Sequence, residues 1–93
     1  MSAARTSVAL THPTGLHARP AVKLTKLAKT FPATIRVRGG PDGAWVDAKS
    51  IVKVMGLKLR PGTTIELEAE GDGAEHALGE LRDLVERGFD EHG

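Results

Sequence analysis

A strict alternation of apolar and acidic residues between positions 63 and 70 constrains the fold more than any other feature of the sequence. The apolar members are Ile65, Leu67 and Ala69, and the acidic members are Glu66, Glu68 and Glu70. A period of two residues predicts a β-strand with one buried face and one solvated face. Such a strand belongs to an antiparallel sheet, because the strands of parallel sheets are buried on both faces.

Three other segments carry strand patterns and complete a predicted four-stranded sheet. They are residues 5–11, 34–38 and 44–48. The loop at 39–43 is rich in glycine and other turn formers, so the two segments around it are expected to form a β-hairpin. Trp45 is out of phase with the apolar side of its strand, which predicts cross-strand packing on the opposite face of the sheet.

Three helices are predicted between and after these strands. The apolar stripe of the first, at residues 18–30, is Leu24, Leu27, Ala28 and Phe31. The buried side of the second, a short helix with Ser50 as its N-cap, is Ile51, Val54, Met55 and Leu59. Asp72 and Glu75 form an acidic variant of the capping box for the third helix, and Gly88 is its predicted stop. The tail at 90–93 is expected to fray.

The predicted element order is β-α-β-β-α-β-α, within a single domain that covers residues 1–93. A chain of 93 residues has no room for a second domain. One solvent-exposed sheet face and three amphipathic helices predict an α+β domain, in which a four-stranded antiparallel sheet is covered on one face by three helices. A core of this size leaves no room for a deep substrate pocket.

Composition excludes several classes of chemistry. The chain has no cysteine, which removes disulfides, thiolate metal ligands and cysteine nucleophiles. Since the sequence has no apolar run of transmembrane length and no signal core, a soluble, cytoplasmic protein without membrane insertion is expected. His12 and His17 lack the spacing of metal ligands, so neither a metal nor a cofactor is expected.

Charge is divided unevenly along the chain. Residues 1–62 hold eleven lysines or arginines and two acids, whereas residues 63–93 hold two basic residues and ten acids. If the two parts form different faces, one face is basic and suits an acidic partner. One side of the first helix carries Arg19, Lys23, Lys26 and Thr30. This basic side is a candidate docking surface.

Residues 13–21 place a histidine where an extended segment turns into a helix. Residues 13–15 supply turn chemistry, and Pro20 fits only the first turn of a helix. His17 is therefore expected at or beside the N-cap, where unpaired N–H groups favour an anion and Arg19 adds a guanidinium. An imidazole in this setting can be a nucleophile whose adduct is anionic, most simply a phosphoryl group. A histidine that only caps the helix is the alternative, which the flanking Gly, Arg and Pro disfavour.

Two separated motifs resemble the HPr family, the histidine-containing phosphocarriers of the bacterial phosphoenolpyruvate-dependent phosphotransferase system. Residues 15–21, Gly-Leu-His-Ala-Arg-Pro-Ala, are similar to the phosphohistidine motif of the family. Residues 49–55, Lys-Ser-Ile-Val-Lys-Val-Met, are similar to its serine-centred motif. The resemblance covers almost the whole chain and implies the open-faced β-sandwich of that family.

The resemblance implies a role for each residue of the first motif. His17 would accept a phosphoryl group on Nδ1 from phosphorylated Enzyme I and pass it to a histidine of an EIIA-type domain. Arg19 would hold the phosphoryl oxygens, Pro20 would fix the helix start and Thr14 would help to orient the ring or the phosphate. Ala18 completes the motif. The protein would carry phosphate stoichiometrically, in sugar uptake or in regulation, and would not be a multiple-turnover enzyme.

The second motif implies regulation and docking. Ser50 matches the serine that HPr kinase/phosphorylase phosphorylates in some members, and a phosphate there would repel acidic partners. A plain N-cap serine is the equal alternative. Lys53 departs from the kinase-regulated pattern, because several of those members carry glycine at that position, and Lys58 replaces a small residue. The predicted docking residues are Lys23, Lys26, Lys49, Ile51, Lys53, Val54 and Met55.

Other functions stay open at this point. A small nucleic-acid-binding or adaptor domain would explain the basic part of the chain but not the His17 motif, and it would lack stacking aromatics. A paralogue that only binds partners would be expected to lack His17. A carrier with a regulatory output is also open, because Gly-Phe-Asp-Glu at 88–91 is similar to the ending of nitrogen-branch members, called NPr. A monomer is expected.

Overall fold

One sheet holds all four strands of the computed structural model, which describes residues 3–11 and 18–90. The strands are β1 (Ala3–Ala9), β2 (Thr34–Arg38), β3 (Val46–Asp47) and β4 (Thr64–Glu70). Their spatial order is β1-β4-β2-β3, and each neighbouring pair is antiparallel. The helices are α1 (Ala18–Ala28), α2 (Ile51–Gly56) and α3 (Ala74–Glu86), and a short 3-10 segment, η1 (Gly88–Asp90), follows α3.

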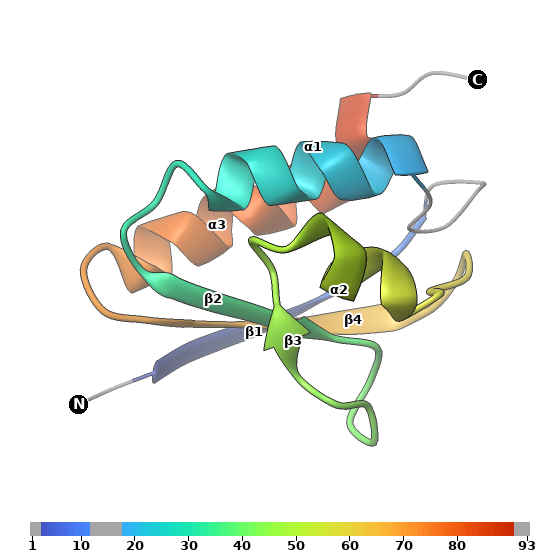
Figure 1. Cartoon of the computed structure of the whole chain (residues 1–93), viewed down its shortest axis with the longest axis horizontal. Coiled ribbons are helices and arrows are strands. Elements are labelled where there is room, and N and C mark those ends of the chain that lie inside the picture. The colour runs from blue at the N-terminus through green and yellow to red at the C-terminus, as the bar shows by residue number, and fades with distance from the viewer. Residues whose placement is uncertain (1–2, 12–17, 91–93) are drawn as a thin grey trace.

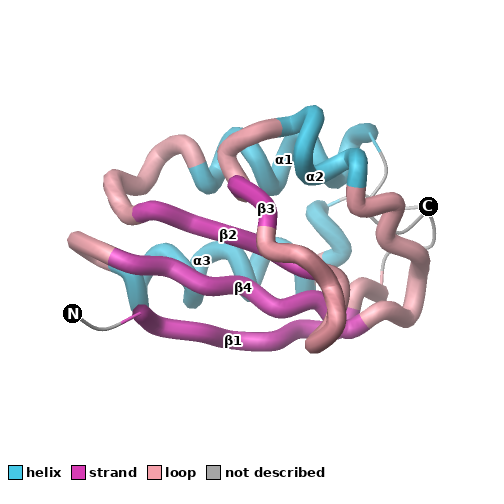
Figure 2. The backbone as a smooth tube through the Cα atoms, turned by 60° about the horizontal axis from the view of Figure 1, so that its bottom comes forward, coloured by secondary structure: helices cyan, strands magenta, loops and turns pink. Residues whose placement is uncertain are grey.

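The three helices cover one face of the sheet and leave the other face open (Figure 1; Figure 2). The predicted α+β architecture, an open-faced sandwich, is therefore confirmed. The apolar residues of β4 face the helices, and Ile65, Leu67 and Ala69 are all completely buried. The helices contribute the other side of the core, which includes Leu24, Ala28, Val54, Leu81 and Val85. Burial of these apolar stripes is what holds the two layers together.

The end of β1 is tied to the beginning of β4. Leu10 N donates to Thr63 O at 2.8 Å, and Gly62 N donates to Leu10 O at 2.8 Å. Leu10 is itself completely buried. This double hydrogen bond fixes the point from which the chain leaves the sheet toward α1.

A row of alternating charge crosses the open face of the sheet. Glu68 on β4 lies in register with Arg5 on β1 and Arg36 on β2. Its carboxylate accepts from Arg5 Nε at 2.8 Å and from Arg36 Nη1 at 3.0 Å. Glu68 is only 7% exposed, so the acidic side of β4 is less solvated than its alternation predicts. The hydrogen bond from Arg5 is the largest cause that lowers the pKa of Glu68, burial opposes it, and Arg36 lowers the pKa further.

Trp45 covers part of the same open face. Arg38 Nη2 pairs with Glu66 Oε1 at 2.6 Å, and Arg38 Cζ lies 4.4 Å from the centroid of the Trp45 ring. Arg5 Cζ lies 5.4 Å from the same centroid. Both guanidinium groups are within cation–π range of the ring. The predicted cross-strand packing of Trp45 is confirmed, and Figure 2 shows the β2–β3 loop on the side of the sheet away from the helices.

Several predicted element ends differ in the structure. β1 is Ala3–Ala9 and not 5–11, and α1 ends at Ala28 and not at residue 30. The capping box of Asp72 and Glu75 is wrong, because the N-cap of α3 is Gly73 at φ 72°, without a side-chain cap. A left-handed residue there favours glycine, and the helix begins one residue later than an Asp72 cap requires. β3 contains only Val46 and Asp47, so the strand predicted at 44–48 is shorter, although Ala48 N still donates to Ile35 O of β2 at 2.9 Å. Asp90 does not fray, since it belongs to η1 and pairs with Arg87.

α2 divides its apolar residues between the core and the surface. Val54 is 0% exposed, whereas Met55 is 39% and Val52 is 77% exposed. The prediction of Val54 as a docking residue is therefore wrong, and so is the prediction of Met55 on the buried side. Positions three apart share a helix face, so Ile51 and Val54 point inward while Val52 and Met55 point outward.

Truncation of the two valines of α2 should have unequal effects. Val54→Ala is expected to lower the free energy of unfolding by about 1–3 kcal/mol, because it deletes two fully buried methyl groups. Val52→Ala is the matched control and should change it by less than about 0.5 kcal/mol. Urea unfolding measures both values, and equal losses would contradict the inward position of Val54.

Glu68→Gln should remove a pH-dependent part of the stability. A carboxyl whose pKa is lowered by folding stabilises the fold above its unfolded pKa, and this contribution is lost as the pH falls through the folded pKa. We expect Glu68→Gln to be less stable by about 1 kcal/mol near neutral pH, a modest value because Arg5 and Arg36 are 60% and 40% exposed. The difference should shrink in acid. Urea unfolding near about pH 7 and about pH 3 measures it, with Glu70→Gln on the same strand face as control; a constant difference would refute the ion-pair account.

Candidate functional site

The candidate site is the beginning of α1. His17 and Thr14 lie outside the described residues, which resume at Ala18, the first residue of α1. Ala18 and Arg19 are exposed, and Pro20 is buried. Pro20 takes the third position of the helix, where its missing N–H costs no intrahelical hydrogen bond. The positive end of the α1 dipole therefore directly follows His17 in the chain.

The charge at this helix start is positive. α1 has no acidic residue in its first turn, so no side chain of that turn opposes the preference of a helix N-terminus for an anion. The exposed guanidinium of Arg19 can bind two oxygens of a phosphoryl group at once. Lys26 is exposed on the same helix. Chemically, this arrangement can hold an anion at the protein surface.

Ser50 caps α2, as the sequence predicts. It has extended backbone angles, φ −108° and ψ 112°, and its Oγ accepts from Lys53 N at 3.3 Å. Asp47 holds the turn before it, since Asp47 O accepts from Ser50 N at 3.1 Å and its Oδ1 accepts from Lys49 N at 2.9 Å. α2 packs beside α1. The fold thus brings the serine-centred motif and the first helix into contact.

Two of the predicted docking lysines have partners within the protein. Lys23 Nζ donates to Phe89 O at 2.9 Å, and Lys49 Nζ donates to Phe31 O at 2.7 Å. Lys26 and Lys53 are exposed, and Ile51 is half-buried against the core. Each of these two lysines therefore ties together two segments that are far apart in the sequence.

Sequence reasoning missed the most exposed large apolar side chain of the described residues. Val52 is 77% exposed, beside the exposed Met55 on the outward face of α2. The signal was present in the sequence, because an inward Ile51 and Val54 leave Val52 on the opposite side of a helix. Exposed apolar side chains that lie together mark a candidate interaction surface.

The chain after α3 forms a left-handed turn that we call the C-terminal hook, residues 88–90. The φ angles of Gly88, Phe89 and Asp90 are 66°, 59° and 59°. Each non-glycine residue in this region costs about 1 kcal/mol or more, so the surroundings must impose the conformation. Phe89 is 0% exposed, and Arg87 Nε pairs with Asp90 Oδ1 at 3.1 Å. Figure 1 shows η1 beside the beginning of α1.

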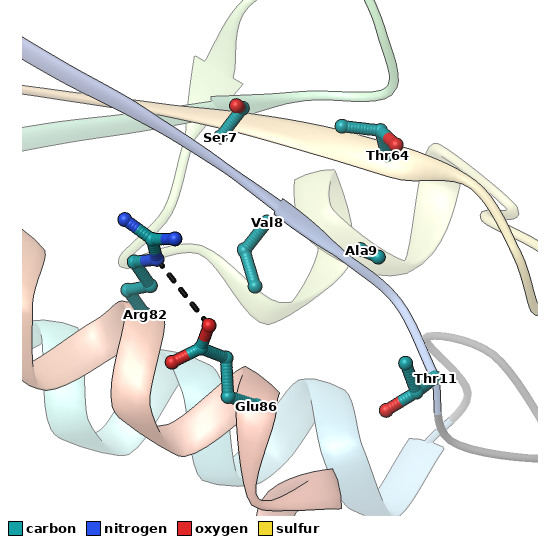
Figure 3. A pocket seen from close by; sticks show the side chains of 7 residues that line it. All are labelled: Ser7, Val8, Ala9, Thr11, Thr64, Arg82 and Glu86. Atoms are coloured by element: carbon teal, nitrogen blue, oxygen red, sulfur yellow. Dashed lines mark ion pairs between the residues drawn. The ribbon is translucent and has the colours of Figure 1, made fainter.

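A shallow pocket of ≈ 390 Å³ lies between the end of β1 and α3 (Figure 3). Its lining residues are Ser7, Val8, Ala9, Thr11, Thr64, Arg82 and Glu86. Arg82 Nε pairs with Glu86 Oε2 at 3.5 Å along α3, on the helix side of this pocket. Among the described residues, none of the predicted site residues lines it. Ala18, Arg19 and Pro20 therefore lie outside this pocket.

Residues 3–11 and 18–90 contain no group of three His, Cys, Asp or Glu side chains placed to hold a metal ion. In the same ranges, no helix has the length and apolar character needed to cross a membrane.

Known proteins are similar to this chain over most of its length. The family described as "PTS HPr component phosphorylation site" matches residues 4–87. Phosphocarrier protein HPr of Pseudomonas aeruginosa is 42% identical over 77 residues, which cover 83% of this chain and 84% of that protein. Phosphocarrier protein NPr of Escherichia coli (strain K12) is 38% identical over 85 residues, which cover 91% of this chain and 93% of that protein.

Solved structures agree with the sequence relatives. HPr-C-His from Thermoanaerobacter tengcongensis superposes with a TM-score of 0.88 at 38% identity, over 97% of this chain and 99% of that chain. The architecture, the helix that begins directly after His17 and the match over residues 4–87 lead to one conclusion. The chain belongs to the HPr family of phosphocarrier proteins of the phosphotransferase system.

Proposed function

We propose that His17 accepts a phosphoryl group from phosphorylated Enzyme I and passes it to a histidine of an EIIA-type protein. The observation that carries this proposal is the start of α1 at Ala18, directly after His17, with Arg19 exposed and Pro20 in the first turn. Membership of the phosphocarrier family supports it. The protein is then a stoichiometric carrier with a covalent phosphohistidine.

The transfer exchanges one N–P bond for another. The lone pair on Nδ1 of neutral His17 attacks the phosphorus while the N–P bond of the donor breaks and the donor imidazole leaves with its electron pair. Arg19 and the first N–H groups of α1 bind the phosphoryl oxygens, and Thr14 orients the ring or the phosphate. Ala18 and Pro20 keep the helix start close to the acceptor. Because donor and acceptor are both histidines, a surface site suits both transfers.

Partner proteins dock on the faces of α1 and α2 next to this site. Val52 and Met55 provide apolar contact area, and Lys26 and Lys53 provide positive charge around it. Since α1 and α2 are in contact, these side chains belong to neighbouring parts of the surface. An apolar centre with a charged rim is the usual anatomy of a transient interface, and the charge would steer acidic partners.

Ser50 is proposed as a regulatory phosphorylation site for an HPr kinase/phosphorylase. It is partly exposed at the N-cap of α2, a position where a phosphate gains from the helix dipole. The added charge would lie beside the docking residues and would repel acidic partners. Incorporation of phosphate from ATP by such a kinase, lost in Ser50→Ala, is the deciding measurement; no incorporation would leave Ser50 as a cap only.

The proposal covers both branches of the system, sugar uptake and nitrogen-related regulation. Identity is higher with the HPr of Pseudomonas aeruginosa, at 42%, but the match with the NPr of Escherichia coli is longer, at 85 residues against 77. We propose a single domain over residues 1–93 that acts as a monomer in the cytoplasm. Sedimentation of the purified protein tests the monomer, and a concentration-dependent dimer would refute it.

Phosphorylation of His17 can be read directly by mass. Incubation with phosphoenolpyruvate and a cognate Enzyme I is expected to add one acid-labile phosphate to the wild type and none to His17→Ala. Intact mass under mildly alkaline conditions measures the gain, because a phosphohistidine hydrolyses in acid. No gain with an Enzyme I that phosphorylates its usual carrier would refute the proposed function.

The docking surface can be tested without touching the acceptor. Val52→Asp and Lys26→Glu are each expected to raise the KM for Enzyme I about threefold to tenfold, with kcat little changed, because they weaken binding outside the reacting groups. Steady-state transfer kinetics measure both constants. Glu80→Gln on α3, away from these faces, is the control. Unchanged KM values in both variants would refute this docking surface.

A further inference from the structure

We propose that the C-terminal hook and Lys23 form a strut that positions the first turn of α1, which makes Lys23 and Phe89 positioning residues for phosphoryl transfer. The inference rests on the proposed function, in which His17, directly before this turn, is the acceptor. The family match ends at residue 87, so the hook lies just beyond the segment that it covers.

The strut meets α1 close to the candidate site. Lys23 Nζ donates to Phe89 O at 2.9 Å in a partly buried contact. A charged donor makes the stronger class of hydrogen bond. Lys23 follows Arg19 by four residues, so the two side chains share one side of α1, one turn apart. The hook consequently contacts the helix one turn from the guanidinium that would bind the phosphoryl group.

The hook itself is held rigidly. Phe89 is the largest of the completely buried side chains among the described residues, so moving the hook would expose its ring to water. Arg87 and Asp90 pair across the turn, and the left-handed angles of Phe89 and Asp90 depend on these contacts. The hook contacts α1, and the hydrogen bond from Lys23 ties the two together close to the first turn. Loss of the lysine contact should free that turn while the hook stays packed.

Three roles of Lys23 predict different kinetics. A positioning role predicts a lower kcat with saturating partner, because fewer bound complexes reach the reacting geometry. A docking role, which the sequence predicts for Lys23, would raise KM instead. A purely structural role would lower the stability and leave both constants unchanged for the folded protein. Lys26 is the matched control, because it lies on the same helix and is exposed.

The experiment compares Lys23→Met, Lys23→Arg and Lys26→Met as carriers for Enzyme I. Lys23→Met keeps the apolar stem and loses the charged donor; we expect kcat to fall about tenfold with KM within about twofold of wild type. Lys23→Arg should restore kcat, since a guanidinium can donate to the Phe89 carbonyl. Lys26→Met should change only KM. A wild-type kcat in folded Lys23→Met would overturn the strut.

Amide hydrogen exchange gives a second readout that needs no phosphate. The amides of Val22 and Leu24, which bond back to carbonyls of the first turn of α1, should exchange about tenfold faster in Lys23→Met and at wild-type rates in Lys26→Met, because only the first change frees the turn. Should Lys23→Met fail to fold, Phe89→Leu takes its place with the same expectations, since it loosens the hook but keeps an apolar side chain. Unchanged exchange overturns the strut alone. A wild type that Enzyme I does not phosphorylate, with protected amides, overturns the proposed function and with it the reaction that the strut would serve.

Discussion

The pairing of β4 on both of its edges is the constraint on which the rest of the structure depends. β1 and β2 both run antiparallel to it, although their sequences are about 30 residues apart. With β4 in that place, its apolar residues must face the helices, and its acidic residues must face the open side. The arginines of β1 and β2 then meet Glu66 and Glu68 in register. A slip by one residue would bury these charges and expose the core.

The same pairing delivers the candidate site to the surface. Leu10 is bound to residues 62 and 63 at the start of β4, so the chain leaves the sheet from a fixed point before it reaches His17. α1 begins at Ala18, and it belongs to the packed layer of helices that covers the sheet (Figure 1). A carrier that exchanges phosphate between large partners needs such access. A deep pocket would shield the acceptor from both of them.

Periodic features could be predicted from the sequence, whereas single contacts could not. The alternation at 63–70 and the stripes of α1 and α3 are statistical properties of many residues, and they gave the right sheet and the right layers. The N-cap of α3 depends on one glycine with a positive φ, which the sequence does not distinguish from Asp72 as a cap. Likewise, the helical spacing places Lys23 on a charged side of the first helix, and Lys49 belongs to the serine-centred motif. Only the folded chain brings the carbonyls of Phe89 and Phe31 within their reach.

For the candidate site, too, one part could be predicted from the sequence and another part could not. Arg19 and Pro20 take the predicted first turn, since a short motif fixes the local geometry of a helix start. Val54, a predicted docking residue, is buried, and Val52, for which no role is predicted, is exposed. The spacing of Ile51 and Val54 indicates both positions once that pair is taken as the inward side of α2.

The position of Trp45 has a practical consequence. It is the one tryptophan of the sequence, and it lies between Arg5 and Arg38 on the side of the sheet opposite the helices. Its fluorescence therefore reports on the attachment of the edge strand β1 and of the β2–β3 loop. A partner that bound over α1 and α2, as proposed, would leave the ring untouched. The fluorescence of Trp45 would then report on the integrity of the sheet without responding to that binding.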